Sequence, residues 1–328
     1  ALDANTTGSN NTAIGTQALT ANTEANNNTA LGKNALKLNT TGTDNTAVGT
    51  ESLEANTTGD NNTAVGKNAL TASTTANNNT AVGYDSLGAN TTGANNTAVG
   101  RTALQSNTTA DDNTAMGSNA LASNTTGASN TAFGRAALDS NTTASSNTAM
   151  GHNALGVNTT GAENTAVGAN VLDANTTGTD NTAIGFASLG NNTTASRNTA
   201  VGNVALNENT TGADNTAVGK SALEKNTTAS NNTAFGSSAL GVNTTGTSNT
   251  AVGTSALTSN TTADNSTAAT AQQWLTVTKL LAASQKTATA PSTATTTTTA
   301  STEMIAADKD MNTAESLTHQ CHSHCHRC

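Results

Sequence analysis

The side chains with the clearest capacity for chemistry lie at the C-terminus of this sequence. All three cysteines fall within the last eight residues, with histidines between them. Thiolates and imidazoles are ligands of zinc and copper, but the spacing fits no structural zinc module with a second ligand pair. An odd number of cysteines also suits interchain disulfides, so a Zn or Cu site, disulfides and a tail without a specific role all stay open. The candidate ligands are Cys321, His322, His324, Cys325, His326 and Cys328.

The rest of the sequence offers no catalytic set. His152 is the only histidine before residue 265 and occupies a variable position of a repeat, so we expect it to be exposed to solvent. No Ser–His–Asp arrangement and no pair of carboxylates can be nominated for nucleophilic or acid–base chemistry. We therefore predict that the chain is not an enzyme, with no catalytic residues and no bound organic cofactor.

A 17-residue repeat sets the positions of nearly all other residues. It runs through fifteen turns, from residue 11 to about residue 265, without an insertion or a deletion. We number each turn from the Asn of Asn-Thr-Ala. Position 1 is Asn, 2 is Thr, 3 is Ala, 4 is apolar, 5 is Gly, 8 is small and 9 is Leu, while positions 12–14 are usually Asn-Thr-Thr. Ser73 replaces Asn at position 12 in one turn, and position 15 nearly alternates between Gly and Ala, which indicates growth by duplication.

This repeat predicts a β-solenoid. Thr-Ala-Val alternates between the two faces as a strand does, and a glycine at position 5 permits a bend. We expect a narrow core of Val, Leu and Ala. We predict two short strands per turn, with the position-9 Leu entering the core from the second strand. The asparagines at positions 1 and 12 are expected at corners, in left-handed backbone. Seventeen residues are too few for a helical repeat, so the fold class is all-β, a parallel β-solenoid (β-roll) of about fifteen turns.

The sequence divides into three parts. Residues 1–265 form the solenoid domain, and residues 266–290 are predicted to form a helical cap or neck, because an apolar stripe around Trp274 has helical spacing from residue 267 onward. Pro291 ends that helix. Residues 291–328 form a Thr-rich, low-complexity tail that ends in the Cys/His cluster.

Composition and charge narrow the range of partners. The net charge is −9 and aromatic residues are 2% of the chain. There is no Lys/Arg stripe and almost no aromatic side chain for base stacking, which argues against nucleic acid as a partner. No apolar stretch approaches the ~20 residues that span a bilayer. The chain begins in phase with the repeat, so we expect either processing from a longer protein or head-to-tail assembly through an open backbone edge.

The repeat also bears on three further ligands, which are calcium, glycans and ice. Calcium is not expected, because position 17 varies among Asn, Asp, Ser, Glu and Arg and forms no carboxylate ladder. The Asn-Thr-Thr triplets are glycosylation sequons, but turns ~4.8 Å apart are too close for a glycan on each, so corner hydrogen bonds explain them better. The regular ranks of Thr resemble the ice-binding faces of insect-type antifreeze proteins, which use Thr-x-Thr with both hydroxyls pointing the same way. Here the Thr-Thr hydroxyls of positions 13 and 14 should diverge, and position 2 supplies only one rank. Ice binding is therefore kept as an alternative.

The unit Asn-Thr-Ala-Val-Gly-x-x-Ala-Leu, as in Thr46-Ala47-Val48-Gly49, resembles the head repeats of YadA-like trimeric autotransporter adhesins. It is closer to the Asn-Thr-Ala-Val-Gly … Asn-Thr-Thr-Gly repeats of bacterial surface proteins and phage tail-fibre-like proteins. The resemblance covers about 265 residues. It implies a parallel β-roll, commonly a homotrimer, that serves as a rigid spacer or adhesive stalk. No coiled-coil stalk, membrane anchor or chaperone domain follows the repeats in this sequence.

From these features we expect a structural subunit of an extracellular fibre, filament or surface appendage, with adhesion as a further role. Its expected partner is itself, end to end or as a homotrimer, with a host-surface glycan or ice as further ligands and no nucleic acid. The expected location is extracellular, on a cell surface or on a virion. The alternatives are an ice-binding solenoid and a receptor-binding fibre of a phage or other virion.

Overall fold

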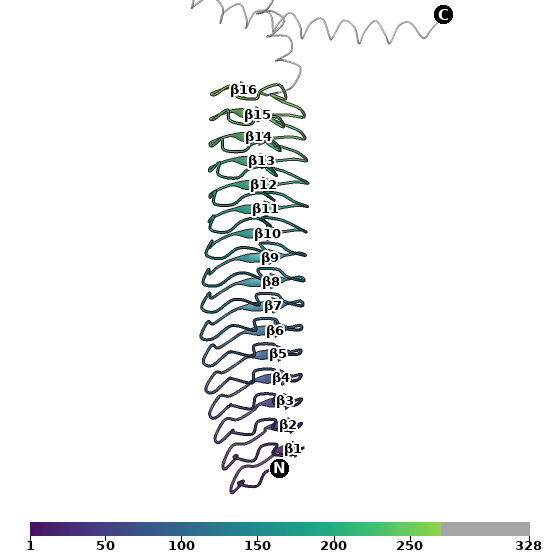
Figure 1. Cartoon of the computed structure of the whole chain (residues 1–328), viewed down its shortest axis with the longest axis vertical. Helices are drawn as coiled ribbons and strands as arrows, with labels where there is room; N and C mark the ends of the chain where they lie inside the picture. Colours follow the sequence, from purple (N-terminus) through teal and green to yellow (C-terminus); the bar gives the residue numbers. More distant parts are fainter. Residues whose placement is uncertain (270–328) are drawn as a thin grey trace, which may run out of the picture. The chain divides into compact units, whose positions relative to one another are not determined.

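A computed structural model describes residues 1–269, which form a parallel β-solenoid (Figure 1). Sixteen strands lie in one sheet in the order of the sequence, each paired in parallel with the next. The register is constant, with Thr opposite Thr and Ala opposite Ala, as in the pairing of Thr46 and Ala47 with Thr63 and Ala64. The predicted parallel β-solenoid of about fifteen turns is confirmed.

The strands are two or three residues long. They are β1 (Thr12–Ile14), β2 (Thr29–Leu31), β3 (Thr46–Val48), β4 (Thr63–Val65), β5 (Thr80–Val82), β6 (Thr97–Val99), β7 (Thr114–Met116), β8 (Thr131–Phe133), β9 (Thr148–Met150), β10 (Thr165–Val167), β11 (Thr182–Ile184), β12 (Thr199–Val201), β13 (Thr216–Val218), β14 (Thr233–Phe235), β15 (Thr250–Val252) and β16 (Thr267–Ala268).

The prediction of two strands per turn is wrong, because each turn has one strand. The position-9 leucines lie in left-handed backbone, with φ of 50° at Leu53 and 52° at Leu70. Left-handed backbone costs an L-residue about 1–2 kcal/mol, and full burial of a leucine returns roughly 1.5–3 kcal/mol. The backbone still bonds to the neighbouring turn, as from the Leu53 N–H to the Ala69 carbonyl (2.9 Å). Leucine therefore reaches the core through a tight turn.

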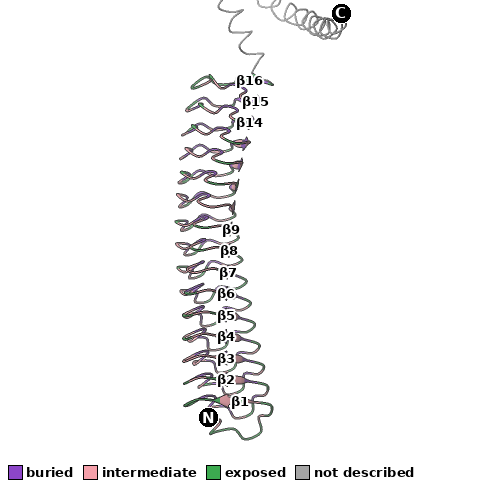
Figure 2. Ribbon diagram, turned by 90° about the vertical axis from the view of Figure 1, so that its right-hand side faces the viewer, coloured by how far each residue is buried: buried purple, intermediate pink, exposed green. Residues whose placement is uncertain are grey.

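The core is a narrow column of small side chains and leucines. The alanines at position 3 and the leucines at position 9 are fully buried from the second to the fourteenth turn, with Ala, Ser or Val at position 8 packed beside them. Figure 2 shows this burial repeating from turn to turn along the stack. Because side chains alternate across a strand, burial of position 3 places positions 2 and 4 on the outside of the sheet. The prediction that Val of position 4 belongs to the core is therefore wrong.

The asparagines at positions 1 and 12 form a second, polar core. Both amides donate to the position-15 carbonyl of their own turn, as Asn28 and Asn39 do to Gly42 (2.8 and 2.9 Å). Each also bonds to its equivalent in the neighbouring turn, as Asn56 Nδ2 does to Asn39 Oδ1 (2.7 Å). These asparagines are buried rather than left-handed, so that part of the prediction is wrong; left-handed residues occupy positions 7, 9 and 17 instead.

The alternation at position 15 has a physical basis. A Cβ at Gly93 would collide with the Ala110 carbonyl and lie 2.5 Å from Asn90 Oδ1. Each turn with Ala at position 15 carries an acceptor at position 16 that bonds to the position-16 N–H of the preceding Gly turn. Asp111, for example, accepts from the Ala94 N–H (2.6 Å). The two kinds of turn therefore complement each other as pairs.

The solenoid continues slightly beyond its predicted boundary. β15 pairs in parallel with β16, so Thr267 and Ala268, where the predicted helix was to begin, are strand residues. The remainder of the predicted helical cap and the Thr-rich tail lie outside the described residues.

Candidate ligand-binding face

The outer face of the sheet carries a continuous apolar rank at position 4. Its most exposed members are Ile14 (59%), Phe235 (57%) and Phe133 (52%). A monomer seldom exposes an apolar patch larger than a few hundred Å², and this rank extends over fifteen turns. The rank consists of Ile14, Leu31, Val48, Val65, Val82, Val99, Met116, Phe133, Met150, Val167, Ile184, Val201, Val218, Phe235 and Val252.

Beside it runs a rank of free hydroxyl groups. The position-2 threonines of β1 to β15 make no side-chain hydrogen bond within the described residues, and each is half-buried or exposed. The position-13 threonines differ, because their hydroxyls donate to the next turn, as Thr57 does to the Thr74 carbonyl (3.0 Å). The position-2 hydroxyls are therefore available to a ligand.

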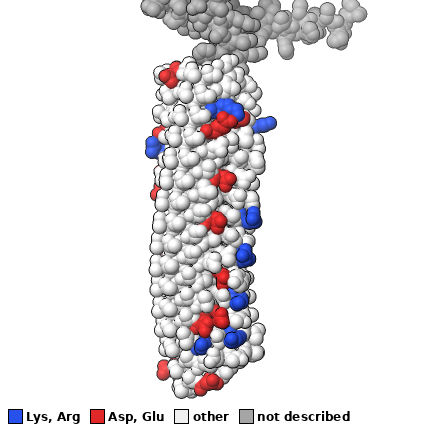
Figure 3. Space-filling view, in the orientation of Figure 1, with Lys and Arg blue, Asp and Glu red and all other residues white. Residues whose placement is uncertain are grey.

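On the other side of the apolar rank, position 6 carries most of the cations. Residues 1–269 contain eight Lys and Arg residues, and five of them occupy this position, all exposed. No Asp or Glu occurs at positions 1 to 6 of any of the fifteen turns. Figure 3 shows Lys and Arg side chains in a column along one edge of the solenoid. The five are Lys33, Lys67, Arg101, Arg135 and Lys220.

The sequence interpretation that the cations form no stripe is therefore wrong. The residues of position 6 are 17 apart along the chain and come together only when the turns stack. The signal is present in the repeat, because five of the eight Lys and Arg residues of residues 1–269 share position 6. Within residues 1–269, none of the five forms an ion pair with a carboxylate; the Lys and Arg residues that do are Lys37, Arg197 and Lys225.

The aromatic side chains occupy the same two repeat positions as the apolar rank and the cations. Residues 1–269 contain four, and all are exposed, by 46% to 57%. Tyr84 and Phe186 are at position 6, whereas Phe133 and Phe235 are at position 4, and each is three turns from the next. At ~4.8 Å per turn, consecutive aromatic side chains are about 14 Å apart along the axis.

No carboxylate occupies positions 1 to 6, and Glu51 and Asp85 follow directly at position 7. Partial burial raises the pKa of Asp139 and of Asp173, while Arg135 lowers the first and His152 lowers the second by a smaller amount. His152 is exposed as predicted, and its Nε2 lies 2.8 Å from Arg135 Nη1. Within residues 1–269, Arg135 is the hydrogen-bond partner of the His152 ring.

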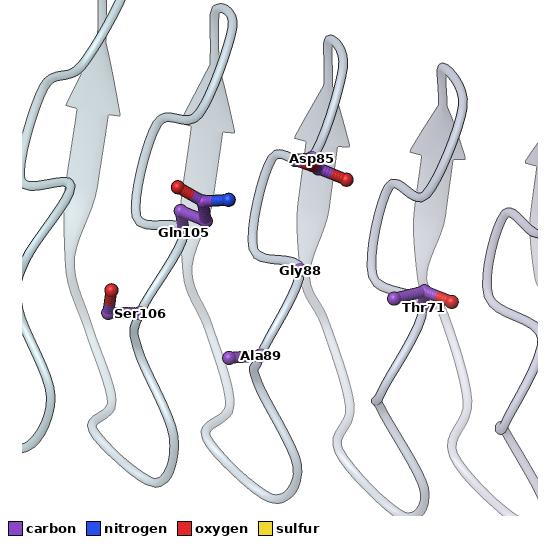
Figure 4. Close-up of a pocket in the computed structure, with 6 residues that line it drawn as sticks. All are labelled: Thr71, Asp85, Gly88, Ala89, Gln105 and Ser106. Carbon is purple, nitrogen blue, oxygen red and sulfur yellow. The ribbon is translucent and has the colours of Figure 1, made fainter.

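The solenoid also has a shallow open groove, where Gly88 lacks a side chain and lies between Thr71 and Gln105 of the two neighbouring turns. Figure 4 shows the lining residues spread over three neighbouring turns, with no convergence of polar groups. Among residues 1–269, no three His, Cys, Asp or Glu side chains are grouped so that they could hold a metal ion. The groove therefore has neither the enclosure nor the chemistry of an active site.

The structure describes the predicted sequon asparagines but not the candidate metal ligands. The sequon asparagines at position 12, such as Asn124 and Asn141, are buried and hydrogen-bonded, which agrees with the structural interpretation of the triplets. In the described part of the chain, no helix has the length and apolar character needed to cross a membrane. The candidate metal ligands Cys321, His322, His324, Cys325, His326 and Cys328 lie outside the described residues.

Comparisons of the chain with models of protein families, with curated proteins and with solved structures found no match.

Proposed function

We propose that the chain is a structural subunit of an extracellular fibre or surface appendage, in which the solenoid is a stiff spacer that also adheres to a ligand. The supporting observation is the uninterrupted sheet of sixteen strands in constant register. Backbone and asparagine hydrogen bonds tie each turn to the next, so bending the rod would break bonds in several ladders at once. Such a rod holds its two ends at a constant separation.

The expected partner is a further copy of the chain. Among residues 1–269, β1 pairs with β2 alone, and a strand with one free edge is a template for another strand. End-to-end assembly into filaments would use this edge. The homotrimer implied by the YadA-like resemblance would instead cover the position-4 rank.

Electron microscopy of the full chain tests the spacer function. Straight rods of about 70 Å, or filaments with a ~4.8 Å layer repeat, are expected. Compact or irregular particles would contradict the function. Rods of one length at every concentration would contradict end-to-end assembly while leaving the spacer role intact.

Ice binding is the second candidate, and the rank of free position-2 hydroxyls favours it. The neighbouring position-4 rank mixes Val with bulkier residues such as Met116 and Phe133, and these interrupt the flat surface that an ice plane requires. Thermal hysteresis of the purified chain decides between the two functions. A receptor-binding fibre of a virion shares the spacer architecture and would be separated from a cellular appendage by the location of the native protein.

A further inference from the structure

We propose that the face formed by positions 2, 4 and 6 binds a linear anionic polysaccharide that lies along the solenoid axis. The inference rests on the proposed fibre function for its biological setting and adds the chemical class of the ligand. Its basis is the coincidence on one face of unpaired cations, exposed aromatic rings and free hydroxyls, with no carboxylate among positions 1 to 6.

The charge distribution selects an anionic ligand. The chain has a net charge of −9, yet this face carries cations alone. Lys33, Lys67, Arg101 and Arg135 are two turns apart, which is about 10 Å at ~4.8 Å per turn. Because none of them pairs with a carboxylate of residues 1–269, an incoming anion would not have to displace an existing ion pair.

The exposed aromatic side chains favour a ligand made of sugar rings. A pyranose presents a face of C–H groups that stacks on an aromatic face, and its ring is about as long as one solenoid turn is high. Every third ring of an extended chain can therefore lie over Tyr84, Phe133, Phe186 and Phe235 in succession. Tyr84 lies between Lys67 and Arg101 in consecutive turns, so a ring stacked on it has a cation on either side for its acidic groups.

Two other occupants fit these features less well. Single-stranded nucleic acid stacks successive bases on aromatic side chains, whereas here two turns without an aromatic residue separate each neighbouring pair. The same face of a second copy would present the same cations and no carboxylate at positions 1 to 6, so two such faces have no complementary charge. A polyuronate supplies carboxylates and ring faces together.

The test uses the full chain and two polymers with the same backbone: polymannuronate, and its methyl ester, which is neutral. Binding is measured by titration calorimetry at low and at physiological salt. The unmodified chain is expected to bind the polyuronate at least about tenfold more tightly than the ester, with an affinity that falls as salt rises. Replacing Lys67, Arg101 and Arg135 by Gln should weaken binding by about tenfold or more.

Two further variants complete the design. The matched control replaces Lys37, Arg197 and Lys225 by Gln, which removes the same charge outside the face, and binding should change by less than about threefold because distant charges are screened. The double variant Tyr84→Ala and Phe186→Ala keeps all cations. It should weaken binding of the polyuronate by the same factor at low and at physiological salt, because the lost contact is not ionic. Thermal melting shows whether each variant remains folded.

Four results would overturn the inference: no binding of polymannuronate, an equal loss in the control triple variant, no loss in the double aromatic variant, or equally tight binding of single-stranded DNA. A stable oligomer that Phe133→Ala dissociates would also overturn it, because a second copy would then occupy the face. Electron micrographs of the same samples separate the two proposals. Rods without polyuronate binding contradict the ligand alone, and the absence of rods contradicts the fibre function.

Discussion

Replacing Ser73 by Asn should stabilise the solenoid by closing a gap in the position-12 asparagine ladder. Ser73 is fully buried, and neither its Oγ nor Asn56 Oδ1 has a hydrogen-bond partner. Asn at 73 would donate to Asn56 Oδ1 and to the Ala76 carbonyl, and it would accept from Asn90 Nδ2. These are the bonds that Asn107 makes to Asn90 Oδ1 (2.9 Å) and to the carbonyl of its own turn (3.0 Å).

The expected gain is about 2 kcal/mol. Three hydrogen bonds contribute roughly 0.5–1.5 kcal/mol each, and a buried acceptor that now lacks a partner gains one. Ordering the longer side chain costs part of this, up to about 1–2 kcal/mol. Because solenoid stability is a sum over turns and their contacts, the effect should be local. Hydrogen exchange of the Thr57, Thr74 and Thr91 amides should slow by about thirtyfold, since 1.4 kcal/mol is tenfold.

Two control variants accompany this measurement. Asn124→Ser opens the same gap in an intact part of the ladder and should destabilise its turns by about 2 kcal/mol. Ser123→Asn adds the same side chain at an exposed position and should have little effect. If Ser73→Asn changes exchange at these amides by less than threefold while Asn124→Ser is strongly destabilising, the reasoning from ladder hydrogen bonds is refuted.

Three further outcomes follow from the packing and charges. Gly93→Ala should lower the free energy of unfolding by about 2–3 kcal/mol, because the added Cβ meets the Ala110 carbonyl and overpacking is destabilising. Ala110→Gly should lower it by less than about 1 kcal/mol. Equal losses in denaturant unfolding would contradict the pairing of Gly and Ala turns. Leu121→Ala should cost about 3 kcal/mol and Val99→Ala under about 1 kcal/mol, because Leu121 is buried and Val99 is half-exposed. Burial raises the pKa of Asp139 and Asp173, so the folded state binds more protons than the unfolded state and stability falls as pH rises from the ordinary Asp pKa through the raised one. Asp139→Asn and Asp173→Asn should therefore raise the melting temperature at pH 7 and lose this effect below the ordinary Asp pKa; an unchanged difference across pH would contradict the stated cause.

The architecture was predictable because a strict period leaves few alternatives. A repeat of 17 residues without insertions must stack equivalent positions, so the parallel sheet and its constant register followed from the spacing alone. The burial of Leu at position 9 was also predicted from its constancy in the repeat, whereas the expected burial of Val at position 4 is wrong. The correct part of the prediction depends on the recurrence of one residue type at one position from turn to turn.

The detailed path of each turn was not predictable. A leucine in left-handed backbone runs against its intrinsic preference, and it occurs because a tight turn completes the core only when neighbouring turns bury the side chain. The asparagines at positions 1 and 12 look like corner residues in sequence. They are interior residues in the structure, because two amides from opposite sides of the turn reach one carbonyl.

The sequence by itself determined the period, the fold class and the burial of the position-9 Leu, because these depend on which residue types recur at which spacing. Only the tertiary structure decided the path of each turn, and with it which repeat positions face outward together. Lys67, Arg101 and Arg135 are isolated cations in the sequence and share one repeat position when the turns stack, with no carboxylate of residues 1–269 paired to them. Tyr84, Phe133, Phe186 and Phe235 likewise come to lie at equal intervals along that face. Stacking brings residues that are 17 positions apart in the chain to within one turn height, and that step creates the proposed ligand surface.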